Sequence, residues 1–275
     1  MRKIASKDNK TIKYIFDVEE HTIESCLLKL EKYGTVVCVS SQIGCSQNCR
    51  FCASGRKRFV RNLSFEEIIF QVVQIMKDEP KYFEDSFQIT YMGSGEPFSN
   101  QENVLNSIDF FLNEYSNLSR INISTMLPHL NIDTDCLAKY KNRLHIQYSL
   151  HFTDDKVRRR YFNNDCLPTI EQSIRLCDEI SKIIIDKYAI NYILIDNVND
   201  SVEAANQLVE VVKNSNGYLK ISELCSIVNS KFNPSSNSND FIDVLSRSGI
   251  YFETFKSDGK DVNAGCGQFY NDSVI

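Results

Sequence analysis

The chain has 275 residues, with 31 Lys and Arg against 36 Asp and Glu, which gives a net charge of −5 and a pI near 5.5. This balance excludes a protein that coats nucleic acid through its global charge, so a polyanionic partner must meet a local patch. Ten cysteines without an export signal favour metal or redox thiols over a secreted disulfide scaffold. No apolar run is long enough to span a membrane, and we expect a cytoplasmic monomer that does not bind membranes.

Strand-like and helix-like segments alternate from residue 35 onward. Strands are expected at 35–42, 87–93, 120–125, 143–151, 188–195 and 218–225. Helices are expected at 64–78, 101–115, 168–184 and 201–214, the first with a capping box of Ser64 and Glu67. The stretch 233–240 is expected to be a loop before the last helix. Repeated strand-helix units predict the α/β class with a parallel sheet, arranged as an open, partial β/α barrel. We expect one core domain at 35–275 and a short extension at 1–34.

Residues with chemical potential follow these predicted strands. A cysteine-rich loop follows the first strand, and the sequence GSGEP follows the second. Ser124 ends the third strand, and Ser149 and His151 end the fourth. Open parallel sheets bind ligands at the carboxyl ends of their strands, so these segments predict one site.

Three cysteines in the first of these loops, Cys45, Cys49 and Cys52, are spaced C-x3-C-x2-C. A closed tetrahedral zinc site needs four ligands, and this motif offers three. Three thiolates on a four-iron cluster leave one iron open, and an open iron can bind and activate a small molecule. The alternatives are a zinc site that borrows a distant ligand and thiols that are packed in the core.

The cysteine motif, placed directly after a first strand, resembles that of the radical S-adenosylmethionine (SAM) superfamily. In that superfamily the open iron of a 4Fe-4S cluster binds SAM, and an electron cleaves SAM to a 5′-deoxyadenosyl radical. The sequence YMGSGEP at 91–97 resembles the motif that contacts the SAM amino group. Taken alone, two glycines indicate only close backbone approach, as in a plain tight turn.

A longer match narrows the resemblance. The sequence from Cys38 to Val72, followed by MGSGEP, IST, SLH, YILIDNVNDS and NAGCGQ, resembles the RlmN/Cfr family of radical methyltransferases, which modify adenine in RNA. The resemblance covers residues 20 to 270 and indicates a short form without the usual N-terminal domain. It implies that Cys45, Cys49 and Cys52 hold the cluster. The residues implied to contact SAM are Gly95, Glu96, Ser124, Ser149, Leu150, His151 and Asn229, although the surroundings of Asn229 depart from the Trp-Asn-Pro of the family.

The resemblance also implies how the reaction proceeds. Cys266 accepts a methyl group from SAM, Cys38 later forms a disulfide bond with it to release the product, and Glu24 removes the ring proton. The product is adenine methylated at carbon 2 or carbon 8 in rRNA or tRNA, and flavodoxin or ferredoxin supplies the electron. The residues alone leave other functions open: the same chemistry on a nucleoside-like molecule or a peptide, or a non-catalytic iron-sulfur sensor.

Several of these residues have an ordinary structural alternative. The alternative for Glu24 is a solvated surface carboxylate, that for Cys38 and Cys266 is a packed thiol, and that for His151 is a satisfied strand-end histidine. The basic runs at 56–61 and 157–162 are either solvated faces or a rim that follows phosphates. The remaining cysteines are expected to be core or surface thiols: Cys26, Cys136, Cys166, Cys177 and Cys225.

Overall fold

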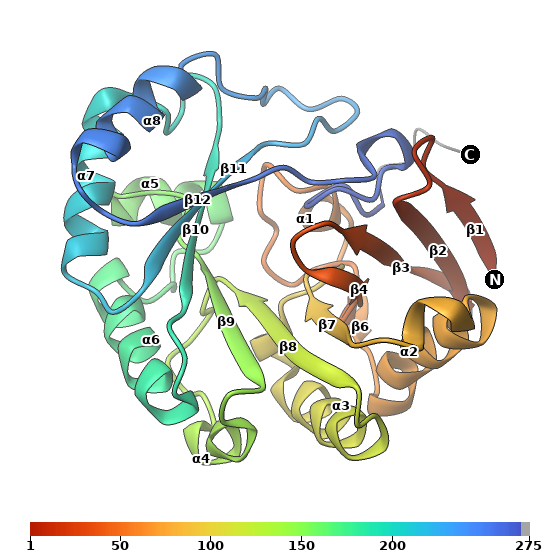
Figure 1. Cartoon of the computed structure of the whole chain (residues 1–275). Coiled ribbons are helices and arrows are strands. Elements are labelled where there is room, and N and C mark those ends of the chain that lie inside the picture. Colours follow the sequence, from red (N-terminus) through yellow and green to blue (C-terminus); the bar gives the residue numbers. More distant parts are fainter. Residues whose placement is uncertain (271–275) are drawn as a thin grey trace. The chain divides into compact units, whose positions relative to one another are not determined.

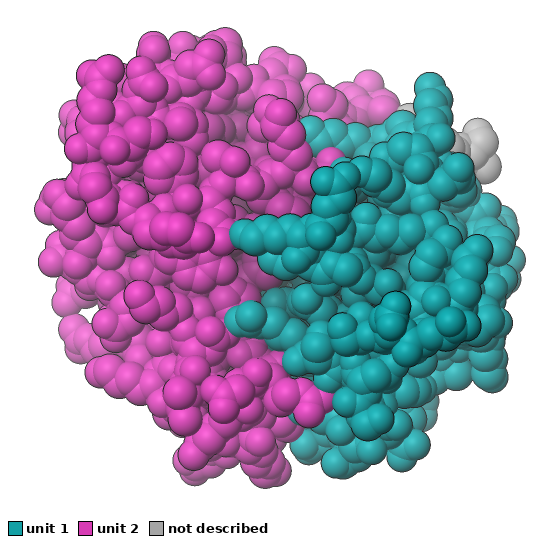
Figure 2. Space-filling view, in the orientation of Figure 1, with its two compact units in different colours: residues 1–124, 258–275 teal, residues 125–257 magenta. Residues whose placement is uncertain are grey.

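The computed structural model describes residues 1–270, which form two compact units (Figure 2). Unit 1 combines residues 1–124 with the segment that begins at Asp258, and unit 2 comprises Thr125–Ser257. The chain therefore leaves unit 1 once and returns to it with its last described segment.

Unit 1 contains a six-stranded stretch of sheet in the order β1-β2-β3-β4-β7-β8 (Figure 1). The neighbours from β1 to β4 are antiparallel, and the pairs β4–β7 and β7–β8 are parallel. Its strands are β1 (Arg2–Ala5), β2 (Thr11–Val18), β3 (His21–Leu30), β4 (Gly34–Cys38), β7 (Phe87–Tyr91) and β8 (Leu118–Thr125), with the short pair β5 (Gln42–Ile43) and β6 (Arg61–Asn62) apart from them. Its helices are α1 (Ala53–Arg56), α2 (Phe65–Asp78), η1 (Pro80–Phe83), η2 (Pro97–Asn100), α3 (Gln101–Glu114) and η4 (Lys260–Val262).

Helix α2 forms where its sequence predicts. The Ser64 side chain accepts a hydrogen bond from the Glu67 backbone N–H at 3.3 Å, and the Glu67 carboxylate accepts one from the Ser64 N–H at 2.8 Å. These two bonds satisfy backbone donors that a helix N-terminus otherwise leaves unpaired. The helix then buries an apolar face formed by Ile68, Val72 and Ile75.

Unit 2 has a parallel sheet in the order β9-β10-β11-β12, and α6, α7 and α8 run along its outer side (Figure 1). The strands are β9 (Leu144–Ser149), β10 (Ala189–Leu194), β11 (Tyr218–Glu223) and β12 (Phe252–Phe255). The helices are α4 (Thr134–Leu137), η3 (Ala138–Tyr140), α5 (Asp155–Phe162), α6 (Ile170–Ile184), α7 (Val202–Lys213) and α8 (Ser238–Arg247).

The predicted fold class is confirmed as α/β with a mostly parallel sheet, and the described residues form no closed barrel. All six predicted strands and all four predicted helices are present. The antiparallel strands β1 to β3 were not predicted, because they contain buried polar residues that resemble those of a surface extension, such as Lys13 and Glu24. The stretch 233–240 is a loop only as far as Asn237, since α8 begins at Ser238.

No helix within residues 1–270 has both the length and the apolar character needed to cross a membrane.

Candidate active site

The cysteine loop, residues 44–52, connects β5 to α1 and depends on two glycines. Gly44 has φ of +73°, and a Cβ there would lie 2.3 Å from the carbonyl oxygen of Arg58. A Cβ on Gly55 would lie 2.6 Å from both the backbone nitrogen and the backbone oxygen of Cys49. Only glycine fits such close backbone contacts, so these residues fix the path of the loop.

The three thiols of this loop influence one another electrostatically. Burial, and then the charge of Cys52, raise the pKa of the Cys45 thiol to about 12. Burial, and then the charges of Cys45 and Cys52, raise the pKa of Cys49, and burial also raises the pKa of Cys52. Three thiolates are therefore stable together here only if a cation compensates them, and a cationic iron-sulfur cluster supplies that compensation.

Backbone donors already point at these sulfur atoms. The N–H groups of Gln47 and Gly95 donate to Cys45, and those of Ser54 and Gly55 donate to Cys52. Hydrogen bonds to cysteine sulfur stabilise the thiolate and tune a bound cluster. The residues present therefore fit a three-cysteine cluster. No three Cys, His, Asp or Glu side chains of residues 1–270 surround a position for a single metal ion, and a four-iron cluster, whose cysteines bind different iron atoms, does not require one.

The turn at 93–97 lies against the start of the cysteine loop. Gly95 has φ of +108°, and a Cβ there would lie 2.6 Å from the Ser41 Oγ. The Glu96 N–H donates to Gln42 Oε1 at 3.1 Å, and the buried Glu96 carboxylate accepts a hydrogen bond from Phe98 N–H at 3.1 Å. These loops follow β4 and β7, which are parallel neighbours, so the predicted cluster and SAM motifs of unit 1 meet at one sheet edge.

The segment that carries Cys266 reaches the same place from the far end of the sequence. The Ala53 N–H donates to the Gly267 carbonyl oxygen at 2.7 Å, and the Ser54 hydroxyl donates to the Phe269 carbonyl oxygen at 3.3 Å. A Cβ on Gly267 would lie 3.8 Å from the Cys52 sulfur. Cys266 itself is half-buried. The segment 263–270 therefore rests on the first turn of α1, directly beside a predicted cluster ligand.

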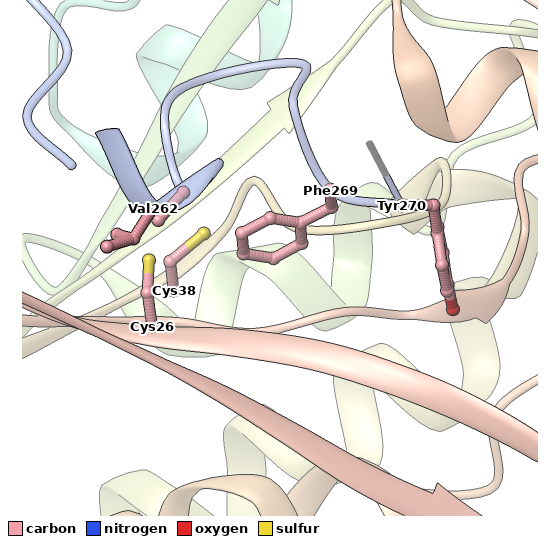
Figure 3. Close-up of a cluster of buried hydrophobic side chains, with 6 residues drawn as sticks. Cys26, Cys38, Val262, Phe269 and Tyr270 are labelled. Atoms are coloured by element: carbon pink, nitrogen blue, oxygen red, sulfur yellow. The ribbon is translucent and has the colours of Figure 1, made fainter. Parts of the chain in front are cut away.

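Cys38 lies beneath this segment and pairs with a second cysteine. Cys38 and Cys26 are direct partners in the antiparallel ladder of β3 and β4. They belong to one buried cluster, whose other members are Val262, Ala264, Phe269 and Tyr270. Figure 3 shows both sulfur atoms on the side of the strands that faces Val262 and Phe269. A hydrogen bond with Cys26, and then burial, raise the pKa of the Cys38 thiol well above its ordinary value.

Glu24 is not a solvated surface carboxylate, which was the ordinary alternative for it. It is buried, and its Oε2 lies 2.7 Å from the Lys13 Nζ and accepts a hydrogen bond from the Tyr270 N–H at 2.9 Å. Lys13 also donates to the Asn263 carbonyl oxygen at 3.1 Å. One buried ion pair therefore holds both ends of the segment 263–270.

The faces of β3 explain this placement. Side chains two residues apart share one face of a strand, so Glu24 and Cys26 both face the segment 263–270. The intervening Ser25 faces the opposite way and donates to Gln71 Oε1 of α2 at 2.6 Å. The same Gln71 oxygen accepts the Ser40 N–H at 2.9 Å, which attaches α2 to the chain just before the cysteine loop.

The remaining predicted SAM contacts lie at strand ends. Ser124 is near the end of β8, Ser149 ends β9 of unit 2, and Leu150 and His151 follow it. His151 has φ of +56°, and its Nδ1 accepts the Ile193 N–H at 3.2 Å. Burial, and then the charge of Arg158, lower the pKa of His151 to about 3, so its ring is neutral.

Asn229 lies in the loop that follows β11 of unit 2 and has φ of +54°. Unit 1 thus brings together the three loop cysteines, Cys38, Cys266, Glu24 and the GSGEP turn. The predicted residues of unit 2 lie after the carboxyl ends of its own strands.

The two basic runs differ. All residues of the run 56–60 are exposed, including Phe59 at 38% and Val60 at 42%. In the second run Arg158 is buried, and it donates to the carbonyl oxygens of Met126 and Pro168. The first run is available for a partner, whereas the central arginine of the second is part of the core.

Sequence reasoning missed Lys13 and Cys26. Lys13 lies in a strand where the sequence predicts only an extension, and no motif contains it. Cys26 lies twelve residues before Cys38, a separation without meaning until the antiparallel register is known. The two-residue spacing of Glu24 and Cys26 could have indicated Cys26, because it places both side chains on one face once β3 is recognised as a strand.

Comparison with known proteins agrees with this geometry. The radical SAM superfamily model matches residues 39–209. A radical SAM methyltransferase of known structure from Sphaerobacter thermophilus superposes with a TM-score of 0.89, at 29% identity over 98% of this chain and 80% of that one. The chain is thus a radical SAM enzyme, and such enzymes use a 4Fe-4S cluster together with SAM.

Within the superfamily the chain belongs to the RlmN family of methyltransferases. It is 33% identical to the "Probable dual-specificity RNA methyltransferase RlmN" of Chlorobaculum tepidum over 94% of this chain and 71% of the relative. It is 32% identical to the protein of the same name from Pseudothermotoga lettingae, over 97% of this chain and 77% of the relative.

Proposed function

We propose that this enzyme methylates carbon 2 or carbon 8 of adenine in RNA, and that Cys266 carries the methyl group. The relatives are named RNA methyltransferases, which supports RNA as the substrate class. The observation that carries the proposal is that the segment with Cys266 lies beside Cys52 of the cysteine loop and also packs on Cys38. That segment is hydrogen-bonded to Ala53, next to Cys52, and its neighbours Ala264 and Phe269 pack on Cys38.

In this proposal Cys45, Cys49 and Cys52 hold the cluster. The cluster and SAM together supply the methyl group and a 5′-deoxyadenosyl radical, with the electron coming from a flavodoxin or ferredoxin. Cys45 is buried, and the N–H groups of Gln47 and Gly95 donate to its sulfur. Gly95 and Glu96 would contact SAM from unit 1, and Ser124, Ser149, Leu150, His151 and Asn229 are proposed to complete the SAM site.

Three residues of unit 1 would act on the substrate. Cys266 lies in a half-buried loop between glycines, where its sulfur can receive a methyl group and present it to a base. Glu24 is proposed to take the ring proton, and its position beside Tyr270 keeps the carboxylate next to the Cys266 segment. Cys38 then attacks the Cys266 sulfur: a sulfur–sulfur bond forms, the carbon–sulfur bond breaks, and the released carbon takes up the proton that Cys38 gives up, so that the base leaves with a methyl group.

The RNA itself is proposed to contact the exposed run 56–60. This run begins at Arg56, the last residue of α1, and α1 begins directly after Cys52, so the run lies beside the cysteine loop. Arg56, Lys57 and Arg58 provide positive charge for phosphates, and the exposed ring of Phe59 is available for stacking on a base. A local patch of this kind accounts for RNA binding by a chain whose net charge is −5.

The test is anaerobic incubation of the reconstituted full chain with SAM, a reductant and total RNA, followed by mass spectrometry of nucleosides. We expect 2-methyladenosine or 8-methyladenosine from the wild type. Cys266→Ala should produce neither and should lack the added methyl group on its own peptide, because no thiol is left to carry it. Cys177→Ala is the matched control, since Cys177 is a buried thiol of unit 2 outside the proposed site, and it should retain the activity.

Other outcomes separate the alternatives. Unmodified RNA together with methylation of a free nucleoside or a peptide would contradict the proposed substrate. A Cys266→Ala variant that still methylates RNA would contradict the proposed methyl carrier. Failure of the wild type to cleave SAM under these conditions would favour a sensor.

A further inference from the structure

Cys26 has no role in the proposed reaction, yet it touches the cysteine that closes the cycle. It is the direct ladder partner of Cys38, is 1% exposed, and is hydrogen-bonded to the Cys38 thiol. Partners across an antiparallel ladder have Cα atoms about 4.5–5.5 Å apart, and disulfide-bonded cysteines have Cα atoms about 4.4–6.8 Å apart. The pair can therefore be oxidised without rearrangement of the sheet.

The proposed cycle ends with a problem that this pair solves. Each turnover leaves Cys266 and Cys38 joined by a disulfide bond, and Cys266 must become a free thiol before it can accept another methyl group. Cys38 is the ladder partner of Cys26 in the sheet, and the segment that carries Cys266 packs on it through Ala264 and Phe269. Thiol–disulfide exchange needs only an attacking thiolate next to a disulfide sulfur.

We propose that Cys26 is a third redox thiol of the cycle, which takes over the disulfide bond from Cys266 and so frees Cys266 for the next methyl group. The inference rests on the proposed function. The Cys26 sulfur attacks the Cys38 sulfur, the Cys26–Cys38 bond forms, and the Cys38–Cys266 bond breaks. Cys266 leaves as a thiolate and takes up the proton that Cys26 gives up, so the exchange needs no external oxidant or reductant.

A dithiol reductant then returns the pair to thiols. A dithiol of the thioredoxin class reduces the Cys26–Cys38 bond, and removal of this product draws the reversible exchange forward. The pair holds the disulfide bond only until that reduction.

The arrangement of the cluster favours this direction. Val262, Ala264 and Phe269 pack on both thiols and hold Cys26 and Cys38 together in one cluster. Cys266 is more exposed than either member of the pair, so the thiol that the exchange frees is the most accessible of the three. The exchange thereby moves the disulfide bond from the loop that carries Cys266 to the pair of strands β3 and β4.

The first measurement is a disulfide map of the full chain. The anaerobic protein is treated with glutathione disulfide, quenched in acid and alkylated, and its peptides are analysed by mass spectrometry. We expect a Cys26–Cys38 bond with free Cys266 in the wild type. In Cys26→Val, a variant of similar size with a strand-favouring residue, the bond should shift to Cys38–Cys266. Cys177→Ala, the control, should give the wild-type map.

The second measurement follows turnover with RNA. Cys26→Val should complete the first turnover at the wild-type rate, and its steady-state rate should then fall because Cys266 stays oxidised. The same bond distribution in wild type and Cys26→Val, or undiminished steady-state turnover of Cys26→Val, would overturn the role of Cys26. Because the map of the wild type needs no substitution, it tests the pair even if Cys26→Val folds poorly.

The failure of each proposal is distinguishable. Absence of a methyl group on Cys266 in protein made in cells would overturn the proposed function and the role of Cys26 with it. A methylated Cys266 together with no Cys26–Cys38 bond would overturn the role of Cys26 alone.

Discussion

Unit 1 and unit 2 each bury a basic side chain, and they compensate its charge in different ways. Within residues 1–270, Lys13 and Arg158 are the Lys and Arg side chains that are buried. In unit 1 the ammonium of Lys13 faces a carboxylate, that of Glu24, at 2.7 Å. In unit 2 the guanidinium of Arg158 donates to two neutral carbonyl oxygens, those of Met126 at 2.7 Å and Pro168 at 2.9 Å.

The aromatic surroundings also differ. The Arg158 guanidinium lies 5.5 Å from the centre of the Tyr148 ring and 5.4 Å from that of Phe162, both in unit 2. The Lys13 ammonium lies 5.7 Å from the ring centre of Phe269, which belongs to the Cys266 segment. Arg158 therefore stabilises its own surroundings, whereas Lys13 attaches a distant part of the sequence to the site. The charges of Lys13 and Glu24 can be removed together by substituting both residues. The partners of Arg158 are backbone carbonyl oxygens, which no substitution removes.

The largest expected effect is that of Lys13→Met. The substitution leaves the Glu24 carboxylate buried without a counter-charge, which typically costs about 3–5 kcal/mol of the free energy of unfolding. It should also reduce methylation, because the Cys266 segment loses its bond at Asn263. Urea denaturation of the full chain measures the first effect, and methylation of the Cys266 peptide measures the second.

A double variant and a control sharpen this result. Lys13→Met combined with Glu24→Gln removes both charges and should recover much of the lost stability, although not the activity. Lys10→Met breaks the exposed ion pair with Glu31 and should change the free energy of unfolding by less than about 1 kcal/mol. Equal free energies of unfolding for Lys13→Met and Lys10→Met would show that the Glu24 carboxylate does not depend on Lys13 for its counter-charge.

A smaller loss is expected for Arg158→Met in unit 2. Two buried carbonyl oxygens lose their donors, and we expect a decrease of about 2–3 kcal/mol in the free energy of unfolding, measured by urea denaturation. No single second substitution should recover it, because the partners are backbone atoms. Arg160→Met is the matched control from the same run: Arg160 is exposed, and its replacement should stay within about 0.5 kcal/mol of the wild type.

The smallest effect concerns pH. The pKa of His151 is about 3 in the folded chain, against 6.5 as its ordinary value, so below pH 6.5 the unfolded chain binds a proton that the folded chain does not. Stability must then fall as the pH is lowered from 6.5 towards 3. His151 changes the free energy of unfolding by at most about 1.4 kcal/mol per pH unit, and by less because its ring is only half-buried.

His151→Asn should flatten this part of the stability curve, because asparagine does not titrate and tolerates a positive φ. Denaturation of both proteins between pH 4 and pH 7 gives the comparison, and His21→Asn in unit 1 serves as the control. Parallel curves for the wild type and His151→Asn would show that His151 is not held neutral by its surroundings.

Much of the fold could be predicted because its signals are local. The capping box of Ser64 and Glu67, the apolar strand runs and the spacing of the cysteine loop each lie within a few consecutive residues. Residues whose role depends on long-range pairing could not be predicted in this way. Cys26 meets Cys38 only through the register of β3 and β4, and Glu24 is buried only because Lys13 of a neighbouring strand compensates its charge.

The two basic runs show the same limit. The sequences at 56–61 and 157–162 both combine arginines with aromatic residues, and nothing local distinguishes them. Arg158 lies on the buried face of helix α5, where it donates to backbone carbonyl oxygens, whereas the run 56–60 is exposed. Burial of a charged side chain is decided by partners that lie elsewhere in the sequence.

The discontinuity of unit 1 has a consequence for how the protein is made. Ribosomes release a chain from its N-terminus, and domains tend to fold as they emerge. Here residues 1–124 emerge first, yet Val262, Ala264 and Phe269, which cover Cys26 and Cys38, are synthesised after the whole of unit 2. The two thiols therefore remain uncovered on a nascent sheet until residues 262–269 have been synthesised, and Cys266, the proposed methyl carrier, is the last of the ten cysteines to arrive.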